Sequence, residues 1–372
     1  MNSYTIQISL FILILLASCL SCKDKETDTA EDLFFASSPL CESKVLYDFI
    51  ALETTENNLI GYISKIKIVQ NKIFVLDAVI SKTLQVYDLK GRYLQQVGAI
   101  GNGPGEYTTP NNFYIDGLNN VLLIINQSKS QIIEYDLNTL SYKKTYLAPF
   151  YFASAQPVSN GHFVWYQPMG YEMKRIKYYL QITERTLEDV TNYHYPIDFP
   201  TSLGLPSSQD VFYEYEDRSF FFLMHNPIIY EITPSGIQSK YRLKVEGHQF
   251  LPLDYLKSIS ENRTNNTVLA SDYIVSYTFH EVKDWIFSSF LVNRQIKSGL
   301  FNKKEGKSFS LSSFEKEGKL MNLSLPFVGT YYNGFIGYIR PAEKNLEYLK
   351  KNIKEDISTE DNPILCLIKF QE

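Results

Sequence analysis

The chain has 372 residues, of which 44% are hydrophobic and 15% aromatic, and its formal net charge at pH 7 is −5. The hydrophobic content excludes a disordered chain, and the negative charge argues against nucleic-acid binding. Aromatic side chains fit the half-buried surface of a strand, so 28 tyrosines and 24 phenylalanines favour a β-rich protein.

The N-terminal residues 1–22 are predicted to be a signal peptide and anchor region. The run from Ile6 to Leu16 is apolar and too short to span a bilayer, as in a signal peptide. Leu16-Ala17-Ser18-Cys19 follows it and resembles a bacterial lipobox, which predicts lipid attachment at Cys19, with Cys22 as the alternative. The first seven residues carry no Lys or Arg, unlike a typical signal peptide. A short membrane anchor or a mis-assigned start remains the other interpretation.

The next segment, residues 23–40, is predicted to be a flexible tether, because its first part (KDKETDTAED) is polar and charged. Residues 41–372 are predicted to form one domain. Cys41 and Cys366 lie at the two ends of that domain. A disulfide between them is possible outside the cytoplasm if the chain ends meet, and two separate buried thiols are the alternative.

A hairpin repeat runs through the domain. Short apolar strands are followed by an acidic turn residue at Asp88, Asp136, Glu184 and Glu231, which are 48, 48 and 47 residues apart. In the first copy, Asp88 can accept backbone hydrogen bonds in the turn and Gly91 can supply a positive φ. The spacing suits four-stranded propeller blades, and the 332 residues from Cys41 onwards allow about six of them.

Several segments lie outside the repeat. Short helices are predicted around 253–260 and at 342–351, and a final strand at 364–370. The strand at 44–54 is predicted to pair with strands from the C-terminal end, because an open ring would leave a strand edge unpaired.

Three motifs resemble those of a known family. Gly98 to Tyr107 reads GAIGNGPGEY, Leu52-Glu53-Thr54 opens the domain, and Asp361-Asn362-Pro363-Ile364-Leu365 closes it. They resemble motifs of the six-bladed β-propeller lipoproteins of Bacteroidota, which have an NHL- or TolB-like propeller architecture. The resemblance implies an all-β fold, a six-bladed β-propeller of four-stranded antiparallel blades with short helical insertions. It also implies export and lipid anchoring to the outer membrane, on its periplasmic or cell-surface face, and it brings no catalytic residues.

The glycine-rich loop has two interpretations. Gly101, Gly103 and Gly105 free the backbone to expose N–H groups, as in an anion-binding nest. However, Pro104 removes a donor and no Lys-Ser/Thr pair or helix follows. We therefore predict a structural crossover between blades, with Glu106 and Tyr107 anchoring it to a neighbouring blade.

No catalytic or metal motif is evident in the sequence. The five histidines lack metal-ligand spacing, and neither a GxSxG elbow nor a calcium loop occurs. The sequence thus predicts no cofactor, no metal and no identifiable catalytic residue, although a catalytic pair could assemble from distant blades.

Aromatic clusters offer a possible ligand surface. Trp165 and Tyr166 lie near Pro168 and Gly170, so we expect them to be exposed for ligand stacking, with blade packing as the alternative. The resulting hypothesis is a cell-envelope lipoprotein whose propeller binds or scaffolds a glycan, a peptide or an envelope protein, and has no nucleic-acid partner. The alternative is a propeller hydrolase or lyase acting on glycans or lactones, with residues converging at the central channel.

Overall fold

The computed structural model describes a defined part of the chain. The described residues are 30–36, 38, 45–148, 150, 152–158, 161–167, 178–184, 190–196, 211–223, 225–233, 236–252, 254–255, 271–311, 327–353 and 356–370. The predicted signal peptide, with Cys19 and Cys22, and Cys41 lie outside them, as does nearly all of the helix expected around 253–260.

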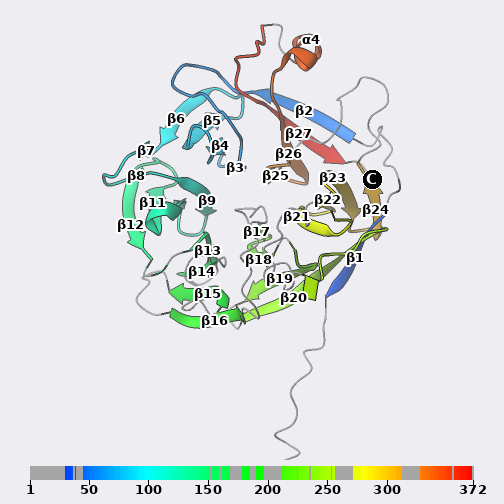
Figure 1. Cartoon of the computed structure of the whole chain (residues 1–372). Helices are drawn as coiled ribbons and strands as arrows, with labels where there is room; N and C mark the ends of the chain where they lie inside the picture. Colours follow the sequence, from blue (N-terminus) through cyan, green and yellow to red (C-terminus); the bar gives the residue numbers. More distant parts are fainter. Residues whose placement is uncertain are drawn as a thin grey trace, which may run out of the picture.

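Six antiparallel four-stranded sheets are arranged around an axis as the blades of a propeller (Figure 1). Blade 1 consists of β3 (Lys65–Val69), β4 (Lys72–Asp77), β5 (Thr83–Asp88) and β6 (Tyr93–Val97). Blade 2 consists of β9 (Pro110–Asp116), β10 (Val121–Asn126), β11 (Gln131–Asp136) and β12 (Tyr142–Leu147), with the 3₁₀ turn η2 (Gln127–Lys129) between β10 and β11. Blade 3 consists of β13 (Ser154–Val158), β14 (His162–Tyr166), β15 (Tyr178–Glu184) and β16 (Val190–Pro196).

The remaining blades complete the ring. Blade 4 consists of β17 (Phe212–Tyr215), β18 (Arg218–Phe222), β19 (Ile228–Thr233) and β20 (Gly236–Val245). Blade 5 consists of β21 (Ile274–Glu281), β22 (Trp285–Val292), β23 (Gln295–Asn302) and β24 (Lys307–Ser310). Blade 6 consists of β25 (Gly329–Tyr331), β26 (Gly334–Ile339), β27 (Ile364–Phe370) and β2 (Val45–Ala51), and the helix α4 (Glu343–Asn352) lies between β26 and β27. The predicted six-bladed fold and the helix expected at 342–351 are confirmed.

Each interface between neighbouring blades has its own apolar core. A strand inside a blade therefore buries both of its faces, and β4 shows the result. Phe74 packs toward blade 2, whereas its neighbour Ile73 packs toward blade 6. Because each blade is covered on both sides, the inner strands read as nearly continuous apolar runs instead of alternating ones.

The turn chemistry expected from the repeat is present. The Asp88 carboxylate accepts hydrogen bonds from the backbone N–H groups of Lys90 (2.8 Å) and Arg92 (3.0 Å). Gly91 has φ +80°, and a Cβ there would lie 2.1 Å from the carbonyl oxygen of Ala51. Only glycine can therefore occupy this turn, where blade 1 meets the outer strand of blade 6.

The two ends of the domain close the ring, as predicted. β2 pairs antiparallel with β27 along all seven of its residues, so blade 6 combines its N-terminal and C-terminal strands. The family-like motifs flank this pairing. The buried Asn362 amide donates to the carbonyl oxygens of Glu53 (2.9 Å) and Asn58 (3.0 Å), and its Oδ1 accepts from the N–H of Ile60 (2.8 Å). Asn362 thus holds the end of the chain against the entry to blade 1.

The prediction of a flexible tether over 23–40 is wrong for one stretch. Residues Glu31–Phe35 form the strand β1, which pairs parallel with β20 as a fifth strand of blade 4. Leu33 and Phe35 are buried between blades 4 and 5, and the Phe35 ring lies 5.2 Å from that of Phe290. The polar composition of residues 23–32 hid the apolar sequence Leu33-Phe34-Phe35 that follows it.

Candidate functional site

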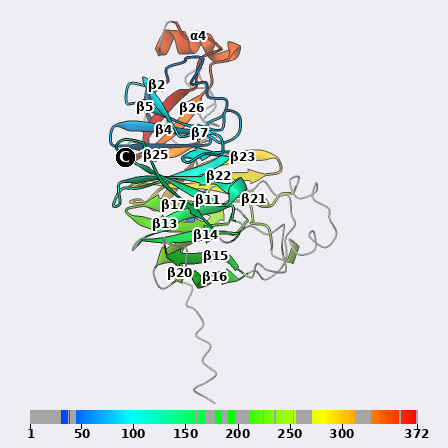
Figure 2. The same cartoon turned by 90° about the vertical axis from the view of Figure 1, so that its left-hand side faces the viewer.

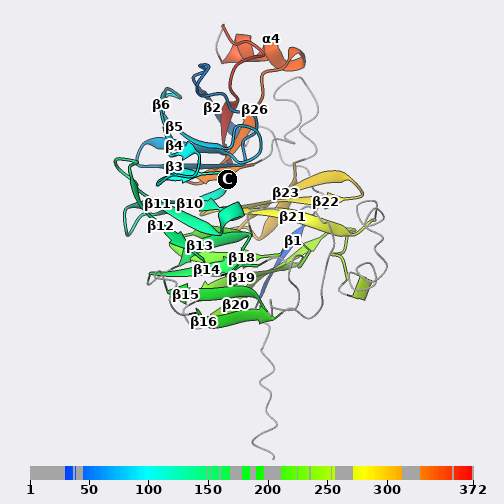
Figure 3. The same cartoon turned by 60° about the vertical axis from the view of Figure 1, so that its left-hand side comes forward.

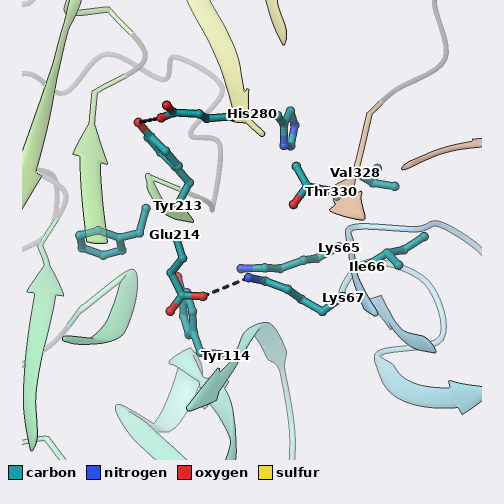
Figure 4. Close-up of a pocket in the computed structure, with 12 residues that line it drawn as sticks. Lys65, Ile66, Lys67, Tyr114, Tyr213, Glu214, His280, Val328 and Thr330 are labelled. Carbon is teal, nitrogen blue, oxygen red and sulfur yellow. Dashed lines mark hydrogen bonds and ion pairs between the residues drawn. The ribbon is translucent and has the colours of Figure 1, made fainter. Parts of the chain in front are cut away.

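The central channel carries charged side chains from several blades. In β3, Lys65 and Lys67 are separated by one residue, so both side chains point into the channel (Figure 4) while Ile66 packs between blades. The Lys65 ammonium donates to Asn112 Oδ1 (2.9 Å) and lies 4.2 Å from the centre of the Tyr114 ring. Blades 1 and 2 are joined at the channel by this contact.

An ion pair spans the channel. Lys67 Nζ lies 3.0 Å from Glu214 Oε2, which belongs to β17 of blade 4. Figure 4 shows the two side chains meeting from opposite sides. The space left among the lining side chains is about 60 Å³. This is room for about two water molecules, whereas ligand pockets measure about 300–1,000 Å³.

A second carboxylate near the channel is fully buried. Glu281 accepts hydrogen bonds from the hydroxyls of Tyr213 (3.1 Å) and Tyr241 (2.8 Å) and forms an ion pair with Lys303 (2.6 Å). Burial, and then the negative charge of Glu281, raise the pKa of Tyr213 well above its ordinary value. The tyrosines therefore stay protonated and donate to Glu281, which joins blade 4 to blade 5.

The charged groups at the channel therefore help to join the blades to one another. Glu214 and Glu281 are each engaged by a lysine, and the small cavity leaves no room for a substrate between them. Among the described residues, no three His, Cys, Asp or Glu side chains come close enough together to hold a metal ion. Glu214 and Glu281 both line the channel cavity, together with His280, but each carboxylate is held in an ion pair with a lysine and is not the free acid or base that the hydrolase hypothesis requires.

The larger cavity lies at the outside of the ring closure. It measures about 490 Å³ and is lined by the outer strand of blade 6, the β5–β6 turn of blade 1 and the segment after α4. We call it the closure groove. Its apolar lining includes Phe49, Leu52, Leu89, Ile353 and Ile357.

Charged side chains border the closure groove. Lys90, Arg92, Glu53 and Asp361 all line it, and the backbone N–H of Glu53 donates to the carbonyl oxygen of Gly91 in the blade 1 turn (2.8 Å). The two carboxylates accept backbone hydrogen bonds, Glu53 from Tyr93 (2.8 Å) and Asp361 from Ser358 (2.9 Å). The groove thus combines an apolar floor with a border of both charge signs. Sequence reasoning missed it because its walls come from three segments that only the closed ring brings together.

The glycine-rich loop is a crossover from blade 1 to blade 2. Glu106 folds back within the loop, where its carboxylate accepts from the Gly103 N–H (2.7 Å), so the expectation that it anchors a neighbouring blade is wrong. At Gly101 a Cβ would lie 2.0 Å from the same carboxylate, so a larger residue there would displace it. Pro104 lies at the exposed tip of the loop. The protein's own carboxylate thus occupies the position that an anion would take in a nest.

Tyr107 anchors the loop as expected. Its hydroxyl donates to the carbonyl oxygen of Val97 (2.8 Å), and burial raises its pKa to about 12. From blade 2, the Tyr135 hydroxyl donates to the carbonyl oxygen of Gly105 (2.7 Å), a residue with φ +73°. Two buried tyrosines therefore fix the loop between the two blades.

The expectation that Trp165 is exposed for ligand stacking is wrong. Trp165 is fully buried in the core between blades 2 and 3, where its ring lies 4.7 Å from that of Phe152 and its Nε1 donates to Thr183 (2.8 Å). Tyr166 is half-buried and packs against Phe221 at 5.9 Å. Both belong to β14, an inner strand whose two faces are covered. They are used for blade packing.

The predicted disulfide has one described partner. Cys366 is a free, buried thiol that packs with Trp285 and Phe335 between blades 5 and 6. Burial raises its pKa to about 12. It packs there as a small apolar side chain, and the disulfide with Cys41 stays a prediction because Cys41 lies outside the described residues.

Fold and site together define a propeller whose channel is bridged by an ion pair and which has a second, larger cavity at the ring closure. The chain belongs to the six-bladed beta-propeller family DUF5128, whose model matches residues 39–337. No curated protein is significantly similar in sequence. No helix among the described residues is long and apolar enough to cross a membrane.

Two solved structures show the same architecture. A Bacteroides fragilis protein described as exported matches with a TM-score of 0.83 at 20% identity, covering 92% of this chain and 100% of its own. A member of the DUF4221 family from Bacteroides vulgatus matches with a TM-score of 0.54 at 10% identity, covering 88% of this chain and 99% of its own. At these identities the likeness shows the fold.

Proposed function

We propose that this protein is an exported, lipid-anchored component of the cell envelope. It binds an extended peptide segment of a partner protein in the closure groove and does not catalyse a reaction on it. The observation that carries the proposal is the groove itself. Its volume of about 490 Å³ lies within the range of ligand sites, whereas the channel cavity of about 60 Å³ does not.

The lining of the groove favours a peptide over a glycan. Sugars are commonly held on the faces of Trp and Tyr rings, whereas the described residues that line the groove are mainly aliphatic, with Phe49 as the one aromatic among them. Aliphatic floors suit the apolar side chains of a peptide. The groove also runs beside β2, the outermost strand of blade 6, and extended peptides commonly add to such strands.

The charges at the border suit binding in a fixed direction. The Arg92 guanidinium lies 2.6 Å from the Asp88 carboxylate, and this ion pair holds the arginine in place. Lys90 belongs to the same tight turn. The carboxylate of Glu53 lies beside the same turn, where it accepts from the Tyr93 N–H (2.8 Å), and Asp361 lies in the segment after α4. A peptide with a basic and an acidic residue on either side of an apolar segment would be oriented by these groups.

A peptide-display selection against the full-length protein tests the proposal. We expect extended peptides with apolar residues to be selected, and Leu89→Glu to weaken their binding about tenfold or more, because it places a charge in an apolar groove. Leu94→Glu is the matched control, since Leu94 is exposed on β6 of the same blade and away from the groove. Selection of no peptide, or equal effects of the two substitutions, would refute peptide binding in the groove.

Lipid anchoring is tested separately. Palmitate labelling is expected to be lost in Cys19→Ala, or in Cys22→Ala if the second cysteine is the acceptor. Labelling that survives both substitutions made together refutes the anchor and leaves the peptide-binding proposal standing.

A further inference from the structure

The fold already contains an example of an added strand. β1 pairs parallel with the outer strand β20 along its whole length and becomes a fifth strand of blade 4. Its alternate residues Leu33 and Phe35 are buried between blades 4 and 5. An extended segment can therefore bind to the outside of a blade of this propeller through its backbone and through every second side chain.

The outer strand of blade 6 offers an edge of the same kind. Among the described strands, β2 pairs only with β27, and it is the last strand of its sheet. Figures 1, 2 and 3 show β2 on the outside of the ring beside α4, at the opposite end of the molecule from β20. The last residues of β2, from Phe49 to Ala51, line the closure groove. The edge of β2 therefore leads directly into the site of the proposed function.

Two contacts show which backbone groups of β2 point away from β27. The N–H of Phe49 donates to a side chain of its own strand, the Asp48 carboxylate (2.9 Å). Two residues further on, the carbonyl oxygen of Ala51 faces the blade 1 turn, where a Cβ on Gly91 would lie 2.1 Å from it. In an antiparallel pair, every second residue directs its backbone groups to the partner strand and the others point away. The outward edge of β2 therefore runs through the backbone of Tyr47 and Phe49.

Asp48 supplies a negative charge at this edge. Its carboxylate bends to the outward N–H of Phe49 and has no ion-pair partner among the described residues, because Lys369 of β27 stands opposite Leu46 instead. Leu46 and Ile50 share one side of β2 with Asp48, the side turned to blade 1, and Leu46 is 49% exposed. An added strand thus meets an apolar, an acidic and an apolar side chain in turn. This order suits a segment with a basic residue between two apolar ones at alternate positions.

We propose that the partner segment binds as a fifth strand of blade 6, paired with the outward edge of β2, and continues into the closure groove. It carries a Lys or Arg opposite Asp48, with apolar residues two positions before and after it. A carbonyl oxygen of the segment replaces the Asp48 carboxylate at the Phe49 N–H, and the released carboxylate pairs with the basic side chain. This inference rests on the peptide binding of the proposed function and names the kind of segment that the site accepts.

Backbone methylation of a synthetic copy of a selected peptide tests the strand pairing. One backbone nitrogen is methylated at a time, and binding to the full-length protein is measured by calorimetry. We expect affinity to fall about five- to tenfold at alternate positions and by less than about twofold at those between, because every second N–H faces β2. Equal effects at all positions overturn the inference, and the groove proposal stands if Leu89→Glu still weakens binding. If no peptide binds, both fall.

Asp48→Asn tests the charge, because asparagine keeps an acceptor for the Phe49 N–H. Affinity for a peptide with the basic residue is expected to fall about two- to fivefold, the size of an exposed ion pair. Asp217→Asn is the matched control, since it removes an equal charge from an exposed turn of blade 4 and should leave affinity unchanged. In Asp48→Lys, the preference should reverse to a peptide with Glu in place of the basic residue. Equal effects of the two asparagine substitutions, or no reversal, overturn the inference and leave the groove intact.

Discussion

Replacing Asn362 should open the ring closure. In Asn362→Ala the side chain loses its hydrogen bonds to Glu53, Asn58 and Ile60, each worth about 1 kcal/mol net. For the bond to Ile60 the cost is about 1–3 kcal/mol instead, because the buried N–H is left without an acceptor. We therefore expect the free energy of unfolding to fall by about 3–5 kcal/mol.

Calorimetry and urea unfolding of the purified variant measure this loss. A change of that size lowers the midpoint temperature by roughly 4–7 °C in a domain of this length. Asn119→Ala is the matched control, because Asn119 bonds only to Asp116 in an exposed turn, and it should change stability by less than about 0.5 kcal/mol. Equal losses in the two variants would show that Asn362 does not hold the ends together.

Three further predictions follow from buried groups and from the docking of β1. The Cys366 thiol, with its pKa near 12, should resist iodoacetamide at pH 8 in the folded protein and react when urea unfolds the protein. Peptide mass spectrometry measures the labelling, and rapid labelling without urea would contradict the prediction. Gly299→Val should drive out the Phe35 ring and expose β1 to protease, while Gly117→Val, at a position with open space around it, should leave β1 protected. Burial lowers the pKa of His225 to about 4, so the folded protein resists the proton that the unfolded chain accepts below pH 6.5. The free energy of unfolding should therefore fall by about 2–3 kcal/mol between pH 6.5 and 4. In His225→Gln this pH dependence should be weaker, and an unchanged dependence would show that the histidine is not its source.

The blade architecture could be predicted because local sequence patterns indicate it. Three of the four predicted acidic turn residues, Asp88, Asp136 and Glu184, end a strand, whereas Glu231 lies within β19, so its prediction as a turn residue is wrong. Asp88 and Gly91 have the turn roles expected of them. The pairing of the first and last strands followed from the need to cover strand edges. Each of these inferences depends on neighbours in sequence or on a rule that applies to the whole sheet.

Long-range contacts could not be predicted in the same way. The motifs around Glu53 and Asn362 were visible as family-like sequences, but their mutual hydrogen bonds appear only when the ends meet. Trp165 was misplaced because nearby Pro168 and Gly170 indicated a loop, whereas its own strand lies inside blade 3. The strand β1 was missed because composition was read over residues 23–40 as a whole, although Leu33 and Phe35 carried the alternation of a half-buried strand.

The most direct test of the account is photo-crosslinking from two positions in the full-length protein, with a selected peptide as the ligand. One photoreactive residue replaces Leu89 in the closure groove, and the other replaces Thr330 at the central channel. We expect a cross-link from position 89 alone, to one continuous segment of a peptide whose mass is otherwise unchanged. A cross-link from position 330 without one from position 89, or a cleaved peptide, would contradict non-catalytic binding at the ring closure.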